Sequence, residues 1–181
     1  FGLDNDTQLQ NEVEADETFV GGKNKNKHAN KKSNENRYEK APVMGMVERG
    51  GKLVAKKIED TTTETLSKEL ILNVKEGATL YTDEYTSYKS LQRIYDHQFV
   101  KHSRKQYVNG RVHTNTIEGF WSILKRGIFG VYHFTSKKHL QLYVDEFVFR
   151  YNSRTNTEAS RFNLLLNNLE NRITYNQLIN G

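Results

Sequence analysis

The sequence predicts one α/β domain with a mixed β-sheet and helices on both of its faces. Three observations lead to this prediction. Strand-like alternation of apolar and polar residues dominates the first third of the chain, and segments with helical apolar spacing alternate with strand-like segments after it. The length of 181 residues also suffices for one domain with a sizeable core. The aromatic content of 11% supports a folded interior.

The composition limits the possible functions. A net charge of +5 favours binding to a polyanionic partner. The absence of cysteine excludes a disulfide framework and a thiolate zinc site within these residues. No apolar run approaches the roughly 20 residues of a membrane span, and no signal peptide is recognisable. We therefore expect a cytoplasmic protein with no membrane partner.

The first three elements form an antiparallel meander in this prediction. Residues 12–20 alternate apolar and acidic side chains, which is typical of a strand with one buried face, and Asp16 falls on the polar side. Residues 41–47 and 53–58 are two further strands joined by a Gly-Gly turn.

The middle of the chain alternates helices and strands. We expect a helix over 61–74, a strand over 78–81, a short helix over 85–94 and a strand over 98–100. Thr61 and Glu64 could form a capping box at the start of the first of these helices. Asp83 directly follows a strand, a common place for active-site groups in open α/β sheets.

The most informative stretch is a helix beginning at Asn115 and ending near Gly127. Asn115 is a suitable N-cap, and Glu118 stands three residues later, as in a capping box. The apolar positions recur with helical spacing and are expected in the core: Ile117, Phe120, Trp121 and Leu124. The opposite face carries Glu118 and, two turns further on, Lys125.

The order of elements matches a ribonuclease H-like fold. After a Gly-rich connector over 127–134, helices are expected over 137–151 and 158–168. Crossovers after the meander imply parallel strands beside it. We divide the chain into a polar N-terminal tail, the domain with its basic insertion, and a polar C-terminal tail: 1–11, 12–170 with the insertion at 21–40, and 171–181.

Three acids are candidates for a shared site. Asp16 lies within a strand, Asp83 at a strand end and Glu118 in the first turn of a helix. Carboxylates on neighbouring strands, about 4.8 Å apart, can share one ion, and a packed helix can present a third. Each acid also has a simpler explanation. Asp16 could lie on a solvated strand face, Asp83 could cap the next helix, and Glu118 could serve only its capping box.

Four sequence blocks, in order, resemble the DDE transposases of bacterial insertion sequences, in particular the ISXO2-like group. The blocks are VEADETFVGG, LYTDEYTSY, HTNTIEGFWSILKRG and YVDEFVFRYNSR, and the similarity covers roughly residues 11–155. The resemblance implies that Asp16, Asp83 and Glu118 form a metal-binding catalytic triad. Some members carry Asn in place of the third acid, so Asn115 is an alternative contact.

The resemblance also implies the chemistry. Two Mg²⁺ or Mn²⁺ ions would be held by the triad, one activating water to cut a strand at the transposon end and the other stabilising the leaving oxygen. The resulting 3′-OH would then attack target DNA. Such proteins usually carry an N-terminal zinc ribbon and act as dimers or larger assemblies. Because the chain begins at Phe1, we expect it to be a fragment without that ribbon.

Basic residues are the candidates for DNA binding. Lys125 is of the type thought to contact DNA near the scissile end in this family. The other candidates are Arg126, Lys101, Arg104, Lys105, Arg111, His113 and Asn115. Contacts of this kind supply affinity with little sequence information, and solvated loops are the alternative. His113 could instead orient the start of the helix.

Two other functions fit the same residues. One is a ribonuclease H-like nuclease that cuts DNA without joining strands. The other is a catalytically inert DNA-binding domain that has kept the fold and the positive charge. The sequences of the transposon ends and the target preference do not follow from these residues.

Overall fold

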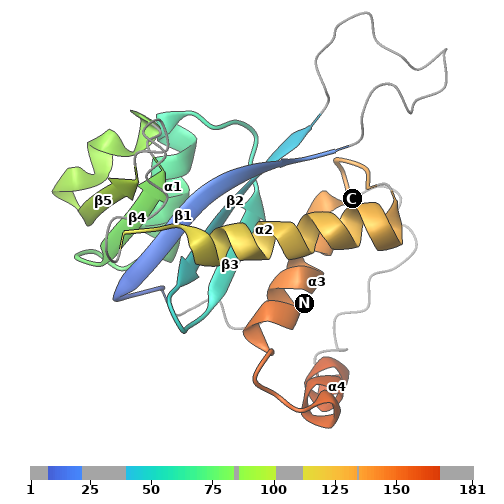
Figure 1. Cartoon of the computed structure of the whole chain (residues 1–181). Helices are drawn as coiled ribbons and strands as arrows, with labels where there is room; N and C mark the ends of the chain where they lie inside the picture. The colour runs from blue at the N-terminus through green and yellow to red at the C-terminus, as the bar shows by residue number, and fades with distance from the viewer. Residues whose placement is uncertain (1–7, 22–39, 84–85, 101–111, 134, 168–181) are drawn as a thin grey trace, which may run out of the picture.

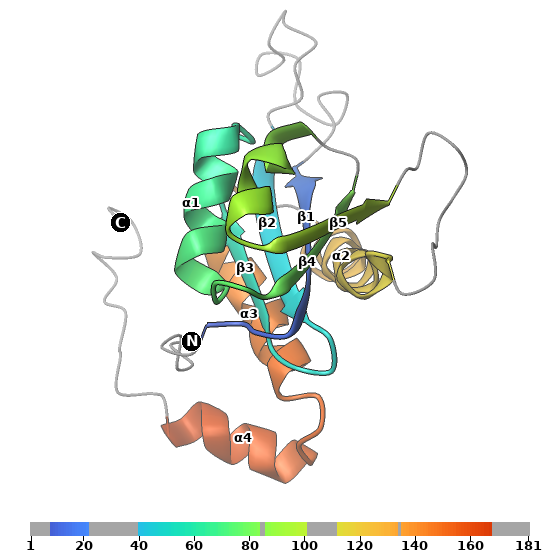
Figure 2. The ribbon, with the colours of Figure 1, turned by 90° about the vertical axis from the view of Figure 1, so that its left-hand side faces the viewer.

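The structure is a computed structural model that describes residues 8–21, 40–83, 86–100, 112–133 and 135–167. A five-stranded mixed sheet forms its centre, with helices on both faces (Figure 1, Figure 2). Within these ranges, no helix is long and apolar enough to cross a membrane. Most of the predicted basic insertion at 21–40, and most of both predicted tails, lie outside the described residues.

The sheet has the order β3-β2-β1-β4-β5, which places β1 at its centre. The strands are β1 (Glu12–Val20), β2 (Ala41–Glu48), β3 (Leu53–Lys57), β4 (Thr79–Asp83) and β5 (Asp96–Val100). The first three strands pair antiparallel, while β4 pairs parallel with both β1 and β5. This is the ribonuclease H-like arrangement, so the predicted meander with added parallel strands is confirmed.

The two faces of the sheet carry different helices. The helical elements are α1 (Thr63–Asn73), the 3₁₀ segment η3 (Thr86–Arg93), α2 (Asn115–Gly127), the π-helical η5 (Ile128–Tyr132), α3 (Leu140–Asn152) and α4 (Glu158–Asn167). Figure 2 shows α1 on one side of the sheet and α2 on the other. One hydrophobic cluster joins α1 and η3 to the sheet, and a second joins α2 and α3 to it.

Strand β1 is covered on both faces, which corrects the prediction of one buried and one polar face. Val13 and Ala15 are fully buried on the α1 side. Glu14 is also fully buried, because α2 covers the side that the alternation assigned to solvent. Phe19, expected in the core, is half exposed near the end of the strand. The acids on the α2 side are tolerated because α2 supplies hydrogen-bond donors to them.

Several helix boundaries differ from the prediction. The N-cap of α1 is Thr62 instead of Thr61, and the Thr62 hydroxyl accepts a hydrogen bond from the Thr65 N–H. The predicted connector at 127–134 is largely helical, because η5 continues α2. Gly127 permits this packing: a Cβ there would lie 2.0 Å from Cζ of Phe147 on α3.

Helix α3 covers the free edge of β3 with two amide side chains. The Asn152 side chain accepts from the Leu53 N–H (2.8 Å) and donates to the Leu53 carbonyl (2.9 Å). Gln141 accepts from the Lys57 N–H (2.6 Å) and donates to the Ala55 carbonyl (3.2 Å). An uncovered edge strand is a template for pairing with another chain. Here the side chains of a helix take the place of the next strand.

We predict that Asn152→Ala destabilises the domain by about 1–3 kcal/mol, because it leaves the Leu53 N–H and carbonyl without their partner. Urea unfolding measures this change. The matched control is Asn163→Ala on α4, where the side chain is exposed and a change within about 0.5 kcal/mol is expected. Equal effects of the two substitutions would show that the edge contact contributes nothing.

Candidate active site

Asp16 and Asp83 lie side by side on neighbouring parallel strands. β1 and β4 pair in register from Glu12–Thr79 to Glu14–Tyr81, and both strands continue in the same direction to Asp16 and Asp83, two residues further on. Because side chains alternate along a strand, both aspartates project from the same face of the sheet. The Asp83 carboxylate also acts electrostatically on Asp16, so the two acids are near each other.

The environment of Asp16 raises its pKa from 3.8 to about 6. The main cause is desolvation by burial, and the second is repulsion by the Asp83 carboxylate. Glu118 raises this pKa further by a smaller amount, whereas hydrogen bonds from the Glu17 backbone and the Trp121 side chain lower it. Asp83 and Glu118, from distant parts of the sequence, are therefore both within electrostatic range of Asp16.

A fourth acid, Glu17, lies on the opposite face of β1. Its pKa is raised from 4.5 to about 7, first by desolvation and then by repulsion from Asp16 and Asp83, while a hydrogen bond from the Tyr88 hydroxyl lowers it. The sequence analysis did not single out Glu17. The region around Asp16 thus concentrates negative charge on both faces of the central strand.

Trp121 holds the Asp16 carboxylate from α2. Its indole Nε1–H donates to Oδ2 of Asp16 over 2.9 Å. The ring lies against Gly45, which pairs with Asp16 across β1 and β2, and a Cβ on Gly45 would lie 2.6 Å from the ring carbons. The prediction that Trp121 is a core residue is confirmed, since it is 4% exposed. Its contact with Asp16 was not predicted, although a glycine inside a strand often marks such a close approach.

Glu118 is exposed in the first turn of α2 and accepts a hydrogen bond from the Thr114 hydroxyl over 3.1 Å. The predicted capping box of Asn115 and Glu118 is not formed. Thr114 is the N-cap, no side chain of that residue caps the backbone, and Asn115 is the first, exposed residue of the helix. The cap comes instead from another part of the chain.

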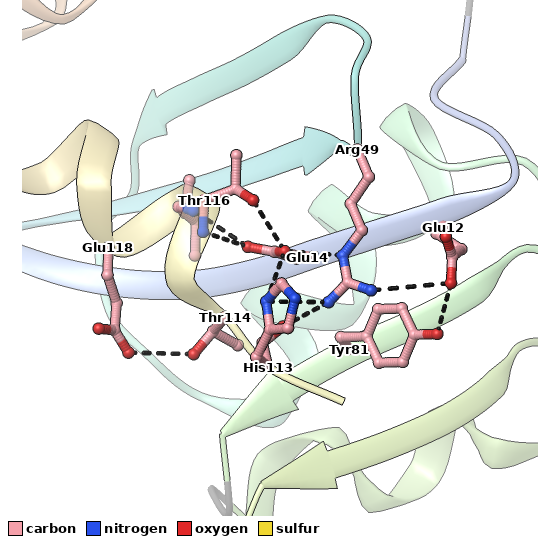
Figure 3. Close-up of polar contacts among 9 residues, drawn as sticks. Glu12, Glu14, Arg49, Tyr81, His113, Thr114, Thr116 and Glu118 are labelled. Carbon is pink, nitrogen blue, oxygen red and sulfur yellow. Dashed lines mark hydrogen bonds and ion pairs between the residues drawn. The ribbon is translucent and has the colours of Figure 1, made fainter. Parts of the chain in front are cut away.

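The carboxylate of Glu14 caps α2. It accepts from the Thr116 N–H (2.8 Å), the Ile117 N–H (3.1 Å) and the Thr116 hydroxyl (2.9 Å) (Figure 3). It also forms an ion pair with Arg49, whose Nε lies 2.8 Å away. The sequence analysis missed this role because Glu14 and Thr116 are far apart in the chain, and an acid in an acid-rich strand suggests solvent exposure.

Arg49, in the turn between β2 and β3, connects this cap to its surroundings. Its guanidinium donates to the His113 carbonyl (2.8 Å), lies 4.1 Å from the centre of the Tyr81 ring and is 3.7 Å from a Glu12 oxygen. The Nδ1 atom of His113 lies 3.3 Å from the Glu14 carboxylate. His113, a predicted DNA contact, is therefore engaged with the start of α2, which was the alternative considered for it.

Of the remaining residues predicted to contact DNA, two lie within the described ranges. Lys125 and Arg126 lie in the last turn of α2, with Lys125 half-buried and Arg126 exposed. Lys125 follows Glu118 by seven positions, which places it about 10 Å further along the same face of the helix. Four other predicted DNA contacts lie outside the described residues: Lys101, Arg104, Lys105 and Arg111.

The donor set suits a hard divalent cation. Asp16, Asp83 and Glu118 offer only carboxylate oxygens, which Mg²⁺ and Mn²⁺ prefer, and the repulsion at Asp16 is what such a cation would relieve. Within the described ranges, no three or more His, Asp or Glu side chains are already arranged to hold a metal ion. Glu118 is instead bonded to Thr114.

Comparison with known proteins identifies the family of this chain. No curated protein matches the chain. Among solved structures, the simian T-cell lymphotropic virus intasome in complex with PP2A regulatory subunit B56 gamma is similar at 9% identity and a TM-score of 0.48, covering 79% of this chain and 48% of that one. This chain thus spans about half the length of that protein. The HTLV-2 integrase catalytic core domain in complex with magnesium is similar at 13% identity and a TM-score of 0.45. The match covers 86% of this chain and 96% of that one.

The sequence model of the ISXO2-like transposase domain matches residues 8–152. This range includes Asp16, Asp83 and Glu118, together with all five strands and α2. The chain therefore belongs to the ISXO2-like transposase domain family.

Proposed function

We propose that this domain cuts a DNA strand at a transposon end and joins the resulting 3′-OH to target DNA. The observation that carries this proposal is the pair of Asp16 and Asp83 on adjacent parallel strands, with Glu118 presented by helix α2, which packs against β1 and β2. The family membership of the chain supports the same chemistry. In this proposal Asp16, Asp83 and Glu118 are the catalytic metal ligands.

The chain's own residues prepare the site for two divalent cations. Asp16 and Asp83 supply oxygen ligands whose mutual repulsion favours cation binding over the empty state. Trp121 restrains the Asp16 carboxylate through a hydrogen bond to its Oδ2. When bound, Mg²⁺ or Mn²⁺ supplies Lewis-acid polarisation of the phosphodiester and a nucleophile at neutral pH.

The DNA-binding surface extends from the acids along α2. Lys125 and Arg126 project from the helix that carries Glu118, at a distance suited to a neighbouring phosphate. Lys101, Arg104, Lys105 and Arg111, from the segment that precedes α2, together with His113 and Asn115 at its start, complete the proposed contacts. We also propose that the protein acts as a dimer or larger assembly on paired ends.

We predict that Asp16→Asn and Asp83→Asn each reduce cleavage of a transposon-end duplex by more than about 100-fold, since loss of a metal ligand should exceed the 10–100-fold effect of outer-sphere partners. DNA binding in a mobility-shift assay should be retained. Asp96→Asn is the matched control, because Asp96 is an exposed acid at the start of β5.

Strand transfer from a pre-cut end separates the proposed function from a simple nuclease, which would give cleaved but no joined product. Metal-dependent cleavage that persists in either aspartate variant would remove these residues from the mechanism. An absence of any metal uptake by the wild-type domain would instead favour an inert DNA-binding domain.

We predict that, without divalent cations, Asp16 and Glu17 lower the free energy of unfolding as pH rises from about 4 to about 7. Their pKa values are raised to about 6 and about 7 in the folded state, so these two groups bind more protons in the folded protein than in the unfolded chain across this range, whereas burial lowers the pKa of His97 and acts in the opposite direction. Asp16→Asn should remove part of this decline, raising stability at pH 7.5 by on the order of 2 kcal/mol.

Urea unfolding in the presence of a chelator, at pH 5 and pH 7.5, measures the effect. Adding Mn²⁺ at pH 7.5 should stabilise the wild-type domain and leave the Asp16→Asn domain nearly unchanged. Parallel pH profiles for the two proteins would show that Asp16 is not strained by burial and by its neighbours.

A further inference from the structure

Glu14 is a fully buried carboxylate that the metal chemistry does not use. It stands two residues before Asp16 on β1, so both side chains point toward α2. Its side chain is 0% exposed, and its oxygens accept two backbone N–H bonds and one hydroxyl bond from the first turn of α2. A carboxylate in this position also favours the positive end of the helix dipole.

The helix is thereby joined to β1 on both sides of Glu118. Glu14 holds the N–H groups of Thr116 and Ile117, two residues and one residue before Glu118. Asp16 holds the indole of Trp121, three residues after it. These two attachments to β1, one before Glu118 and one after it, restrict both sliding and rotation of the helix at that residue. The position of Glu118 relative to the aspartates thus depends on both attachments.

The charge of Glu14 is essential to this arrangement. A buried carboxylate needs a partner, and the Nε of Arg49 supplies one at 2.8 Å. The same guanidinium donates to the carbonyl of His113, in the segment that enters α2 (Figure 3). An uncharged side chain at position 14 would therefore weaken the hold on the helix and on the segment before it, and would leave Arg49 without its buried partner.

We propose that Glu14 is a positioning residue, which fixes the register of α2 on β1 so that Glu118 can complete a cation site with Asp16 and Asp83. This inference rests on the proposed function of the three acids. Glu14 does not bind the cation, because its oxygens are taken by α2 and Arg49. It acts through the placement of Glu118.

The chain contains its own reporter for the test. Trp121 is the single tryptophan, and its indole is bonded to Asp16. Mn²⁺ bound at Asp16 would quench its fluorescence, so a titration of the metal-free domain with Mn²⁺ gives a dissociation constant without any DNA or activity measurement. The emission of the metal-free protein reports whether the α2–β1 contact has moved.

The test compares Glu14→Gln with Glu12→Gln. Both substitutions remove one negative charge from β1 next to Arg49, but the Glu12 carboxylate is bonded to Arg49 and Tyr81, on strand β4. We expect Glu14→Gln to raise the Mn²⁺ dissociation constant about tenfold, the lower end of the effect of outer-sphere partners. Glu12→Gln should leave it within about twofold. Circular dichroism and urea unfolding establish that each variant is folded.

Each result decides a different point. Equal Mn²⁺ affinity of folded Glu14→Gln and the wild type overturns the positioning role and leaves the three-acid site intact. Equal weakening by Glu12→Gln and Glu14→Gln also overturns it, because the effect would then be one of charge alone. Wild-type quenching that is absent, or that persists in Asp16→Asn, refutes the proposed metal site itself.

A milder variant decides the matter if Glu14→Gln does not fold. Thr116→Val removes only the hydroxyl that donates to Glu14 and keeps the size of the side chain. It should weaken Mn²⁺ binding about threefold, less than the loss of a whole outer-sphere partner. An unchanged dissociation constant in this variant would count against the role of Glu14.

Discussion

The parallel pairing of β1 with β4 is the constraint on which the site depends. It brings Asp16 and Asp83 to the same face of the sheet, where burial and repulsion by the Asp83 carboxylate disfavour the negative charge of Asp16. Neighbouring carboxylates of this kind are expensive for a fold and are typical of functional sites. The sheet order puts this pair at the centre of the domain, where the packing on both sides holds the strands in place.

Helix α2 makes this arrangement possible because it brings donors to a strand face that carries acids. A helix with only apolar side chains would remove the hydroxyl donor of Glu14 and the indole donor of Asp16. Instead the open helix terminus faces Glu14 and the indole N–H faces Asp16, while Gly45 leaves room for the indole ring. The same contacts that satisfy the buried acids therefore also determine where Glu118 lies.

Local patterns were sufficient to predict most of the strands and helices, whereas the choice of the three acids came from the family resemblance. The alternation in β1, the turn after β2 and the helical spacing of Ile117, Phe120, Trp121 and Leu124 each depend on neighbours in sequence. The cap of α2 could not be predicted, because it joins residues about a hundred positions apart. The burial of Glu14 could not be predicted for the same reason. An acidic strand face indicates solvent exposure unless the helix that covers it is known.

Two of the simpler explanations for the acids lose their basis in this structure. A solvated strand face would leave the Asp16 carboxyl near its ordinary pKa, whereas desolvation is the largest cause of its raised value. A capping role for Glu118 is unnecessary, because Glu14 already binds the first N–H groups of α2. Glu118 remains exposed, with a bond to one threonine hydroxyl. Burial distinguishes the two glutamates: the enclosed Glu14 binds the first turn of α2, and Glu118 stays accessible.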